Sequence, residues 1–233
     1  MRQVVLDTET TGLEVEQQHR IIEIGCVELY NRRLTGKTFH QYLNPQRDID
    51  LGAQQVHGLT REELGKQPTF SQVHAEFLAF IRDAELIIHN APFDVAFLNA
   101  ELARMEFQQG ISDLCRVLDT LALARQMHPG QRNSLDALCK RYSVDNSHRE
   151  YHGALLDARI LAEVYLAMTG GQGSFALSAE PDMHRGQAYA AAQGRSQLRI
   201  VVVNASEDEA AAHEHILALL DKASSGKTMW RKL

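Results

Sequence analysis

Short apolar runs alternate with polar stretches in the first part of the chain and predict the strands of a sheet. Val4, Val5 and Leu6 form one run, and a longer one extends from Ile21 to Leu29. Such runs, bounded by polar and turn residues, are typical of buried strands. The polar turn at 31–33 favours a hairpin between the second strand and the third. Strands are expected at residues 2–8, 20–30, 36–43, 85–89 and 116–118.

Apolar residues three and four positions apart predict helices around these strands. Phe70, Val73 and Phe77 follow this spacing, which places them on one helix face. Asp119 and Ser134 stand where N-caps of two further helices are expected. Helices or short helical pieces are expected at 52–57, 60–64, 70–81, 93–107, 119–127, 134–142 and 153–168.

The order of these elements predicts the fold class. Three strands come first, and strands and helices then alternate. A hairpin followed by β-α-β units forms a mixed sheet covered by helices. We therefore expect an α/β domain of residues 1–170, with a mixed five-stranded sheet flanked by helices. Its length suffices for one hydrophobic core.

The composition changes after residue 170 and predicts a different organisation. Residues 171–198 are rich in Gly, Ala, Gln and Ser, which favours a flexible linker. A strand is expected at 198–203, and Ser206 with Glu209 forms the capping-box pattern of a helix. Residues 199–233 are too few to bury a core of their own. They are therefore expected to dock on another protein.

Composition and charge exclude several protein classes. The longest apolar runs are far shorter than a membrane span, and the N-terminus is too polar for a secretory signal. Three widely spaced cysteines fit a reducing cytoplasm better than a disulfide framework. Acids and bases balance in 170–198 and in 199–233, so the net charge of −6 lies in 1–169. This charge argues against a broad basic face for nucleic acid, but it leaves room for carboxylates that bind cations.

Acidic residues recur at strand ends and helix starts. Asp7 and Glu9 are two residues apart and share one face of a strand, where they repel unless a cation bridges them. Asp94 follows the strand at 85–89, while His152 and Asp157 flank the start of the last helix. Each alone has an ordinary alternative, as a solvated turn, a helix-dipole acid or a structural His. Together they provide oxygen ligands for two Mg²⁺ ions and a general base.

These residues resemble the motifs of the DEDDh 3′–5′ exonucleases, which have a ribonuclease H-like fold. The surrounding sequence is similar to the epsilon proofreading subunits of bacterial DNA polymerase III, and this similarity extends over essentially the whole chain. The motifs that carry it are LDTETTG at 6–12, VHG at 56–58, HNAPFD at 89–94, RNSLDALC at 132–139 and HGALLDA at 152–158.

The resemblance implies a role for each acid and for the His. Asp7 would bridge two Mg²⁺ ions, for which Mn²⁺ can substitute, and Glu9 and Asp157 would complete the shell of one ion. Asp94 would act through water or the second ion, and His152 would be the general base. The same resemblance assigns the terminal nucleotide to Thr10, Thr11, Gly12, Leu13, Val56, His57, Asn90 and Phe93.

Two points of this assignment stay open. Core packing is the alternative role for Val56 and Phe93. Many relatives also carry an acid shortly before the VHG motif, near the terminal 3′-OH. Residues 51–55 of this chain contain none, which puts a side-chain contact to the 3′-OH in doubt.

The resemblance also implies partners. Gln172, Phe175 and Leu177 match a degenerate sliding-clamp-binding peptide, with an ordinary linker as the alternative. Residues 199–233 would bind the polymerase (alpha) subunit, with Ile216, Leu220 and Trp230 as anchors. The sequence leaves open whether a small accessory subunit binds the nuclease domain.

Three functions compete at this point. The first is a proofreading exonuclease that releases nucleoside 5′-monophosphates from single-stranded 3′ ends of DNA. The second is a related exonuclease that trims RNA, which the core motifs permit but the additional C-terminal segments disfavour. The third is a non-catalytic tether between clamp and polymerase, which the complete set of acids and His disfavours.

Overall fold

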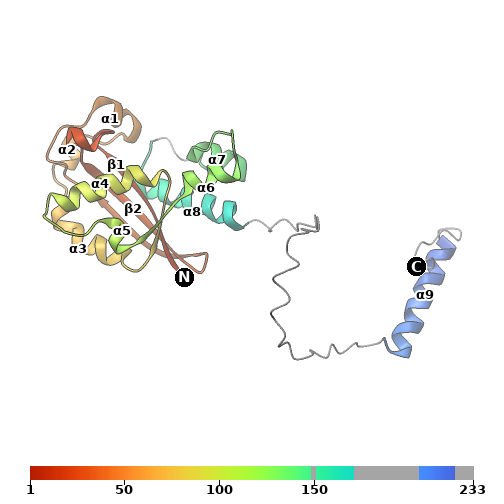
Figure 1. The fold of residues 1–233 in the computed structure, drawn as a ribbon. Helices are drawn as coiled ribbons and strands as arrows, with labels where there is room; N and C mark the ends of the chain where they lie inside the picture. The colour runs from red at the N-terminus through yellow and green to blue at the C-terminus, as the bar shows by residue number, and fades with distance from the viewer. Residues whose placement is uncertain (148–150, 171–204, 224–233) are drawn as a thin grey trace, which may run out of the picture. The chain divides into compact units, whose positions relative to one another are not determined.

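The computed structural model describes residues 1–147, 151–170 and 205–223 (Figure 1). The chain divides into two compact units, Met1–Phe175 and Ala176–Leu233, and each is described by itself. Among the described residues, no helix is long and apolar enough to span a membrane.

The first unit is built on a mixed five-stranded sheet, as the sequence predicts. The strand order is β3-β2-β1-β4-β5. The β1–β2 and β2–β3 pairs are antiparallel, whereas β1–β4 and β4–β5 are parallel. The strands are β1 (Arg2–Thr10), β2 (Ile21–Tyr30), β3 (Arg33–Tyr42), β4 (Glu85–Ile88) and β5 (Arg116–Asp119).

Helices pack on both faces of the sheet (Figure 1). Val4 and Leu6 of β1 share a core with α3 (Phe70–Ile81) and α4 (Ala91–Ala103). Val5 points to the opposite face and joins a core with α8 (Ala154–Gly170). The remaining elements are η1 (Val15–Gln17), α1 (Leu51–His57), α2 (Arg61–Leu64), α5 (Ile111–Leu114), α6 (Thr120–Met127) and α7 (Leu135–Tyr142).

Local sequence sets most helix boundaries. The Asp119 side chain accepts a hydrogen bond from Leu121 N at 2.9 Å and caps α6. Ser134 Oγ accepts one from Ala137 N at 3.4 Å and caps α7. Both caps confirm the predictions, because these side chains satisfy amide groups that have no partner within the first helical turn.

The predicted helix 93–107 is displaced in the structure. The helix begins earlier, at Ala91, because Pro92 fits the first turn of a helix. It ends at Ala103, and Glu106 has a left-handed φ of 58° that no helix can continue through. The short helices η1 and α5 were also missed, because neither is long enough to show a hydrophobic period.

The second unit contains α9 (Glu207–Ala223) among its described residues. Its capping box is confirmed: Ser206 N donates to Glu209 Oε2 at 2.8 Å, and Glu209 N donates to Ser206 Oγ at 3.3 Å. Ile216 and Leu220 are exposed, while Leu217 is buried. The strand expected at 198–203 and the predicted Gln172, Phe175, Leu177 and Trp230 lie outside the described residues.

The first turn of α8 packs directly against the backbone of β2 at Gly25. A methyl group on Gly25 would overlap the carbonyl carbon of Ala154 and the amide nitrogen of Leu155. Only glycine permits this approach, since backbone atoms cannot rotate away as a side chain can. Gly25 therefore sets the height of the α8 N-terminus above the sheet.

Gly25→Ala should destabilise the first unit by about 3 kcal/mol or more, because overpacking against backbone atoms forces a helix to shift. Gly52→Ala, a helical position with open space around it, should be neutral or slightly stabilising. Chemical denaturation of the two variants measures the difference. Equal stability of both variants would contradict the packing described here.

Candidate active site

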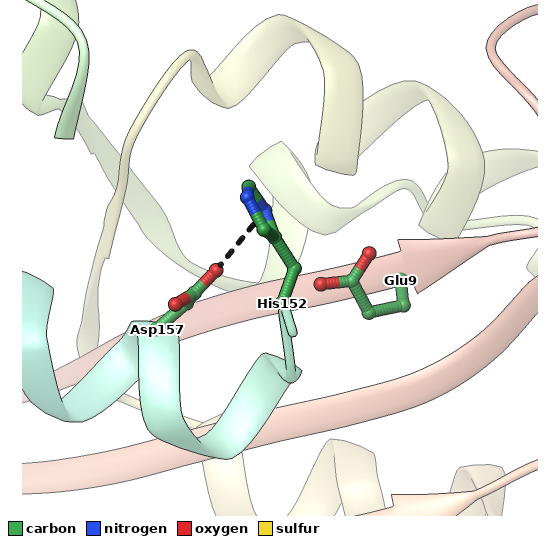
Figure 2. A group of neighbouring side chains, drawn as sticks. All are labelled: Glu9, His152 and Asp157. Atoms are coloured by element: carbon green, nitrogen blue, oxygen red, sulfur yellow. Dashed lines mark ion pairs between the residues drawn. The ribbon is translucent and has the colours of Figure 1, made fainter. Parts of the chain in front are cut away.

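Glu9, His152 and Asp157 converge at the end of β1 (Figure 2). One ligand atom from each lies within 4.8 Å of the other two. His152 Nδ1 is 3.6 Å from Asp157 Oδ2. The side chain of Asp157 is 4% exposed and that of His152 is 44% exposed, so the group lies at the protein surface with one buried carboxylate.

Backbone contacts position the two residues from α8. Asp157 lies in the first turn of the helix, where its amide donates to Gly153 O at 2.8 Å. His152 N donates to Val56 O at 3.0 Å, which connects the start of α8 to the end of α1. His152 is thus fixed by its backbone, while its ring stays accessible to solvent.

Asp7 lies on the same face of β1 as Glu9, because the two residues are two positions apart in one strand. Its register partner in β2 is Gly25, over which the first turn of α8 packs. Asp7 is half-buried, and it is not one of the three residues whose ligand atoms lie within 4.8 Å of one another. The structure thus places Asp7 on the same face of β1 as Glu9 and brings Glu9 and Asp157 together.

Asp94 approaches β1 from α4. The residue is 3% exposed, and Thr8 Oγ1 donates to its Oδ1 at 2.7 Å. Thr8 points to the opposite face of the sheet from Asp7 and Glu9. Burial raises the pKa of Asp94 to about 7, although the Thr8 hydrogen bond opposes this shift. A buried acid of this kind is stabilised in its charged form by a cation.

A buried ion pair holds α4 in place. Arg20 at the start of β2 donates from Nε and Nη2 to the two carboxylate oxygens of Glu101, at 2.6 and 2.7 Å. Glu101 is 3% exposed, so this bidentate pair is largely removed from water. It connects the helix that carries Asp94 to the same strand that positions α8.

His57 presents a buried hydrogen-bond donor. Leu59 N donates to His57 Nδ1 at 3.0 Å, so in the neutral ring the proton is on Nε2. Nε2 is buried and has no hydrogen-bond partner among the described residues. Burial lowers the pKa of His57, as does the nearby charge of His152, which keeps the ring neutral. Nε2–H is therefore available to an oxygen of a ligand.

Four of the eight predicted nucleotide-binding residues line two cavities, whereas Thr10, Thr11, His57 and Phe93 line neither. Gly12, Leu13 and Val56 line the first, of about 460 Å³. Leu13 is 80% exposed and Val56 is 44% exposed, so Val56 is not a core residue. Asn90 lines the second cavity, of about 620 Å³, together with His152. Phe93 is packed against the core and lies 4.9 Å from the ring of Phe97, so its role is at least partly structural.

The sequence analysis missed several residues of the first cavity, among them His19 and Asp50. The buried ring of His19 lies under Gly12, where a methyl group would overlap it, and its Nδ1 is 3.0 Å from Thr11 Oγ1. His19 Nε2 is 3.4 Å from Asp50 Oδ2. Asp50 directly precedes the acid-free stretch 51–55, so a carboxylate is present at this cavity after all. No sequence motif marks the two residues.

The donor set fits hard divalent cations. Carboxylate oxygens are the ligands that Mg²⁺ and Mn²⁺ prefer, and the cluster supplies them from Glu9 and Asp157, with Asp7 beside them. The clustered negative charge needs a bound cation or protons for stability.

Comparisons with known proteins agree with this geometry. The family model described as Exonuclease matches residues 4–165. DNA polymerase III subunit epsilon of Salmonella typhimurium is 53% identical over 99% of this chain and 97% of its own length. The corresponding Escherichia coli protein is 51% identical with the same coverage. That of Rickettsia prowazekii is 47% identical over 93% of this chain and 96% of its own.

Solved structures share the fold at lower identity. Exonuclease X in complex with 5′ overhanging duplex DNA is 24% identical, with a TM-score of 0.56 over 73% of this chain and 94% of that one. The nuclease domain of 3′hExo, a DEDDh family member bound to rAMP, is 19% identical, with a TM-score of 0.61 over 72% and 90%. These likenesses confirm the predicted ribonuclease H-like architecture.

The raised pKa of Asp94 predicts a pH dependence of folding. Between the ordinary value of 3.8 and about 7, the folded protein retains a proton that the unfolded chain loses. The free energy of unfolding is therefore highest, as far as this group is concerned, below about pH 4. As the pH rises from there to about 7, the free energy of unfolding falls by up to about 1.4 kcal/mol per pH unit.

Asp94→Asn should remove this slope. Urea denaturation from pH 4.5 to 7.5, in EDTA, should show the variant gaining stability over the wild type as the pH rises. Asp48→Asn, at a fully exposed carboxylate, is the control and should follow the wild type. A constant difference between Asp94→Asn and the wild type would rule out a raised pKa.

Proposed function

This chain belongs to the exonuclease family and, within it, to the DNA polymerase III epsilon subunits, and from this premise we propose how its residues perform the reaction. It is a 3′–5′ exonuclease that proofreads DNA made by the replicative polymerase. The observation that carries the proposed chemistry is the convergence of Glu9, His152 and Asp157 within 4.8 Å.

The acids form the metal site. Glu9, Asp157 and Asp7 would hold divalent cations, and Asp94 would act on them directly or through water. Two bound cations stabilise the attacking and leaving oxygens of a phosphodiester. We propose Mg²⁺ as the natural ion, with Mn²⁺ as a substitute, because all four ligands offer carboxylate oxygens.

His152 acts as the general base. Its ring is 44% exposed and close to the acids, so water can approach it beside the scissile phosphate. His152 accepts a proton from the water that attacks phosphorus, and the 3′-oxygen of the preceding nucleotide leaves and is protonated by solvent. The products are a nucleoside 5′-monophosphate and a strand one nucleotide shorter with a free 3′-OH.

The first cavity holds the terminal nucleotide. Leu13 and Val56 contact the base through exposed apolar surface, and the backbone of residues 10–13 lines the sugar side. The unpartnered Nε2–H of His57 donates to an oxygen of this nucleotide. A mispaired end frays more readily than a paired one, so less energy is needed to draw it into the cavity.

The C-terminal segments serve assembly. The protein associates with the polymerase and with DNA. We assign contact with the alpha subunit to residues 199–233, for which the exposed Ile216 and Leu220 of α9 provide apolar anchors. Residues 172–177 are assigned to the sliding clamp. The nuclease domain is residues 1–170, and residues 171–198 connect it to the docking segment. This arrangement places the reaction at the replisome in the bacterial cytoplasm.

His152→Ala and Asp7→Ala should each lower the rate of nucleotide release by at least a hundredfold, because one removes the proposed base and the other a proposed metal ligand. The assay follows a 3′-mispaired DNA primer with Mg²⁺, beside an RNA of the same sequence. His74→Ala on α3 is the matched control. A rate within about threefold of the wild type for either site variant would refute the assigned roles, and preference for RNA would refute proofreading of DNA.

Deletion of residues 171–233 should abolish binding to the polymerase subunit and leave the nuclease rate on free DNA within about twofold. The reason is that the first compact unit already contains every residue of the site. Size-exclusion chromatography with the polymerase subunit and the primer assay measure the two properties. Loss of both properties would contradict the division into two functional segments.

A further inference from the structure

The ring of His19 contacts two segments of the first cavity that lie far apart in the chain. The residue precedes β2, and only 3% of it is exposed. Its Nδ1 is 3.0 Å from Thr11 Oγ1, in the loop after β1, and its Nε2 is 3.4 Å from Asp50 Oδ2, just before α1. A methyl group on Gly12 would overlap three atoms of the ring, at 2.2 to 2.5 Å. His19 therefore touches both sides of the cavity while offering almost no surface to a ligand.

Backbone hydrogen bonds connect the same segments. Thr11 N donates to Arg20 O, and Asp50 N donates to Thr11 O, each at 2.9 Å. Arg20 N also donates to Thr11 Oγ1 at 3.0 Å. The loop after β1 is thus held on one side by the residue that follows His19 and on the other by Asp50. The ring of His19 adds a side-chain connection between these two neighbours.

One tautomer of His19 satisfies both polar contacts. With the proton on Nε2, Nδ1 accepts a hydrogen bond from the Thr11 hydroxyl, and Nε2–H faces the carboxylate of Asp50. With the proton on Nδ1, the lone pair of Nε2 would face that negative charge instead. Asp50 therefore favours the first tautomer, because the partner of one ring nitrogen determines where the proton lies. An apolar side chain of similar size could fill the space but could make neither contact.

The first cavity has two walls, and their separation matters for a ligand between them. Gly12 and Leu13 come from the loop after β1, whereas Gly52, Ala53 and Val56 come from α1. A ligand that depends on contacts with both walls is held less well when one wall shifts, since binding groups must stay close to their productive geometry. The residue that connects the walls therefore influences how firmly the ligand is held.

We propose that His19 is a positioning residue for the terminal nucleotide. Through Thr11 and Gly12 it supports one wall of the first cavity, and through Asp50 it fixes the start of α1, which carries the other. Asp50 completes the pair from the solvent side, where its side chain is 59% exposed. The ring acts through these neighbours and does not touch the nucleotide itself. This inference rests on the proposed function, since it explains how the nucleotide cavity keeps its width.

His19→Leu tests the proposal in the full-length protein, because leucine has a similar size and makes neither polar contact. The substrates are a DNA oligonucleotide and the p-nitrophenyl ester of thymidine 5′-monophosphate, which contains a single nucleotide. KM should rise about three- to tenfold on both, the effect of losing one or two hydrogen bonds, and kcat should change by less than about twofold. The Kd of thymidine 5′-monophosphate, measured by calorimetry with Mg²⁺, should rise by the same factor. His19→Asn, whose Oδ1 can replace Nδ1 as acceptor from Thr11, should recover part of the loss.

Asp50→Ala separates positioning from direct contact with the nucleotide. Alone, it should raise KM about threefold, because the ring loses its partner on the α1 side. The double variant His19→Leu/Asp50→Ala should raise KM no further than His19→Leu does, since the two residues act through one contact. If the two effects multiplied, Asp50 would act on the nucleotide independently of His19, and the proposed pair would be wrong.

Tyr165→Phe is the matched control for a general loss of stability. It removes another buried hydrogen bond, which Gln3 Nε2 donates to Tyr165 Oη at 2.9 Å at the other end of β1. The variant should lower the melting temperature and leave KM and kcat unchanged. An unchanged KM in His19→Leu, a loss confined to kcat, or an equal rise of KM in Tyr165→Phe would overturn the inference. A wild-type protein that neither cleaves the two substrates nor binds the monophosphate would instead overturn the proposed function.

Discussion

The close contact between α8 and β2 at Gly25 determines where the site residues lie. His152 immediately precedes this helix, and Asp157 lies in its first turn. Asp7 and Glu9 are on the strand paired with β2, on the face that α8 covers. If a methyl group on Gly25 pushed α8 away from the sheet, His152 and Asp157 would both move away from Glu9. Backbone packing at one glycine is thus a geometric condition for the whole cluster.

Burial of the site's acids has an electrostatic cost. Asp94 on α4 and Asp157 on α8 are each 3% exposed. Buried carboxylates destabilise a folded protein unless they are protonated or paired with cations. The raised pKa of Asp94 is a direct sign of this cost. A site arranged in this way is best suited to its charged form when cations are bound, so folding stability and metal binding are linked.

The net charge of the domain is consistent with an enzyme that holds only the end of a strand. An acidic surface does not attract long stretches of DNA. Cations at the acid cluster offset part of the charge, and Arg125 offers a positive group beside His152. The proposed contact with the polymerase would supply the affinity that the domain's own surface lacks.

Local sequence determined the strands, most helices and their caps, and it indicated the acids and His of the proposed site. Hydrophobic period and capping side chains act over a few residues, so α3, α6 and α7 were predictable from the chain alone. The motifs nominated Asp7, Glu9, Asp94, His152 and Asp157 as site residues, and three of these meet in the structure. Tertiary structure decided what depends on distant residues. It showed that Asp94 approaches from the opposite face to Glu9, and that His57 has a buried donor with no partner in the part of the chain that the structure describes. It also showed that His19, Asp50 and Arg125 border cavities. These features arise where separate segments meet, and no local period or motif encodes such a meeting.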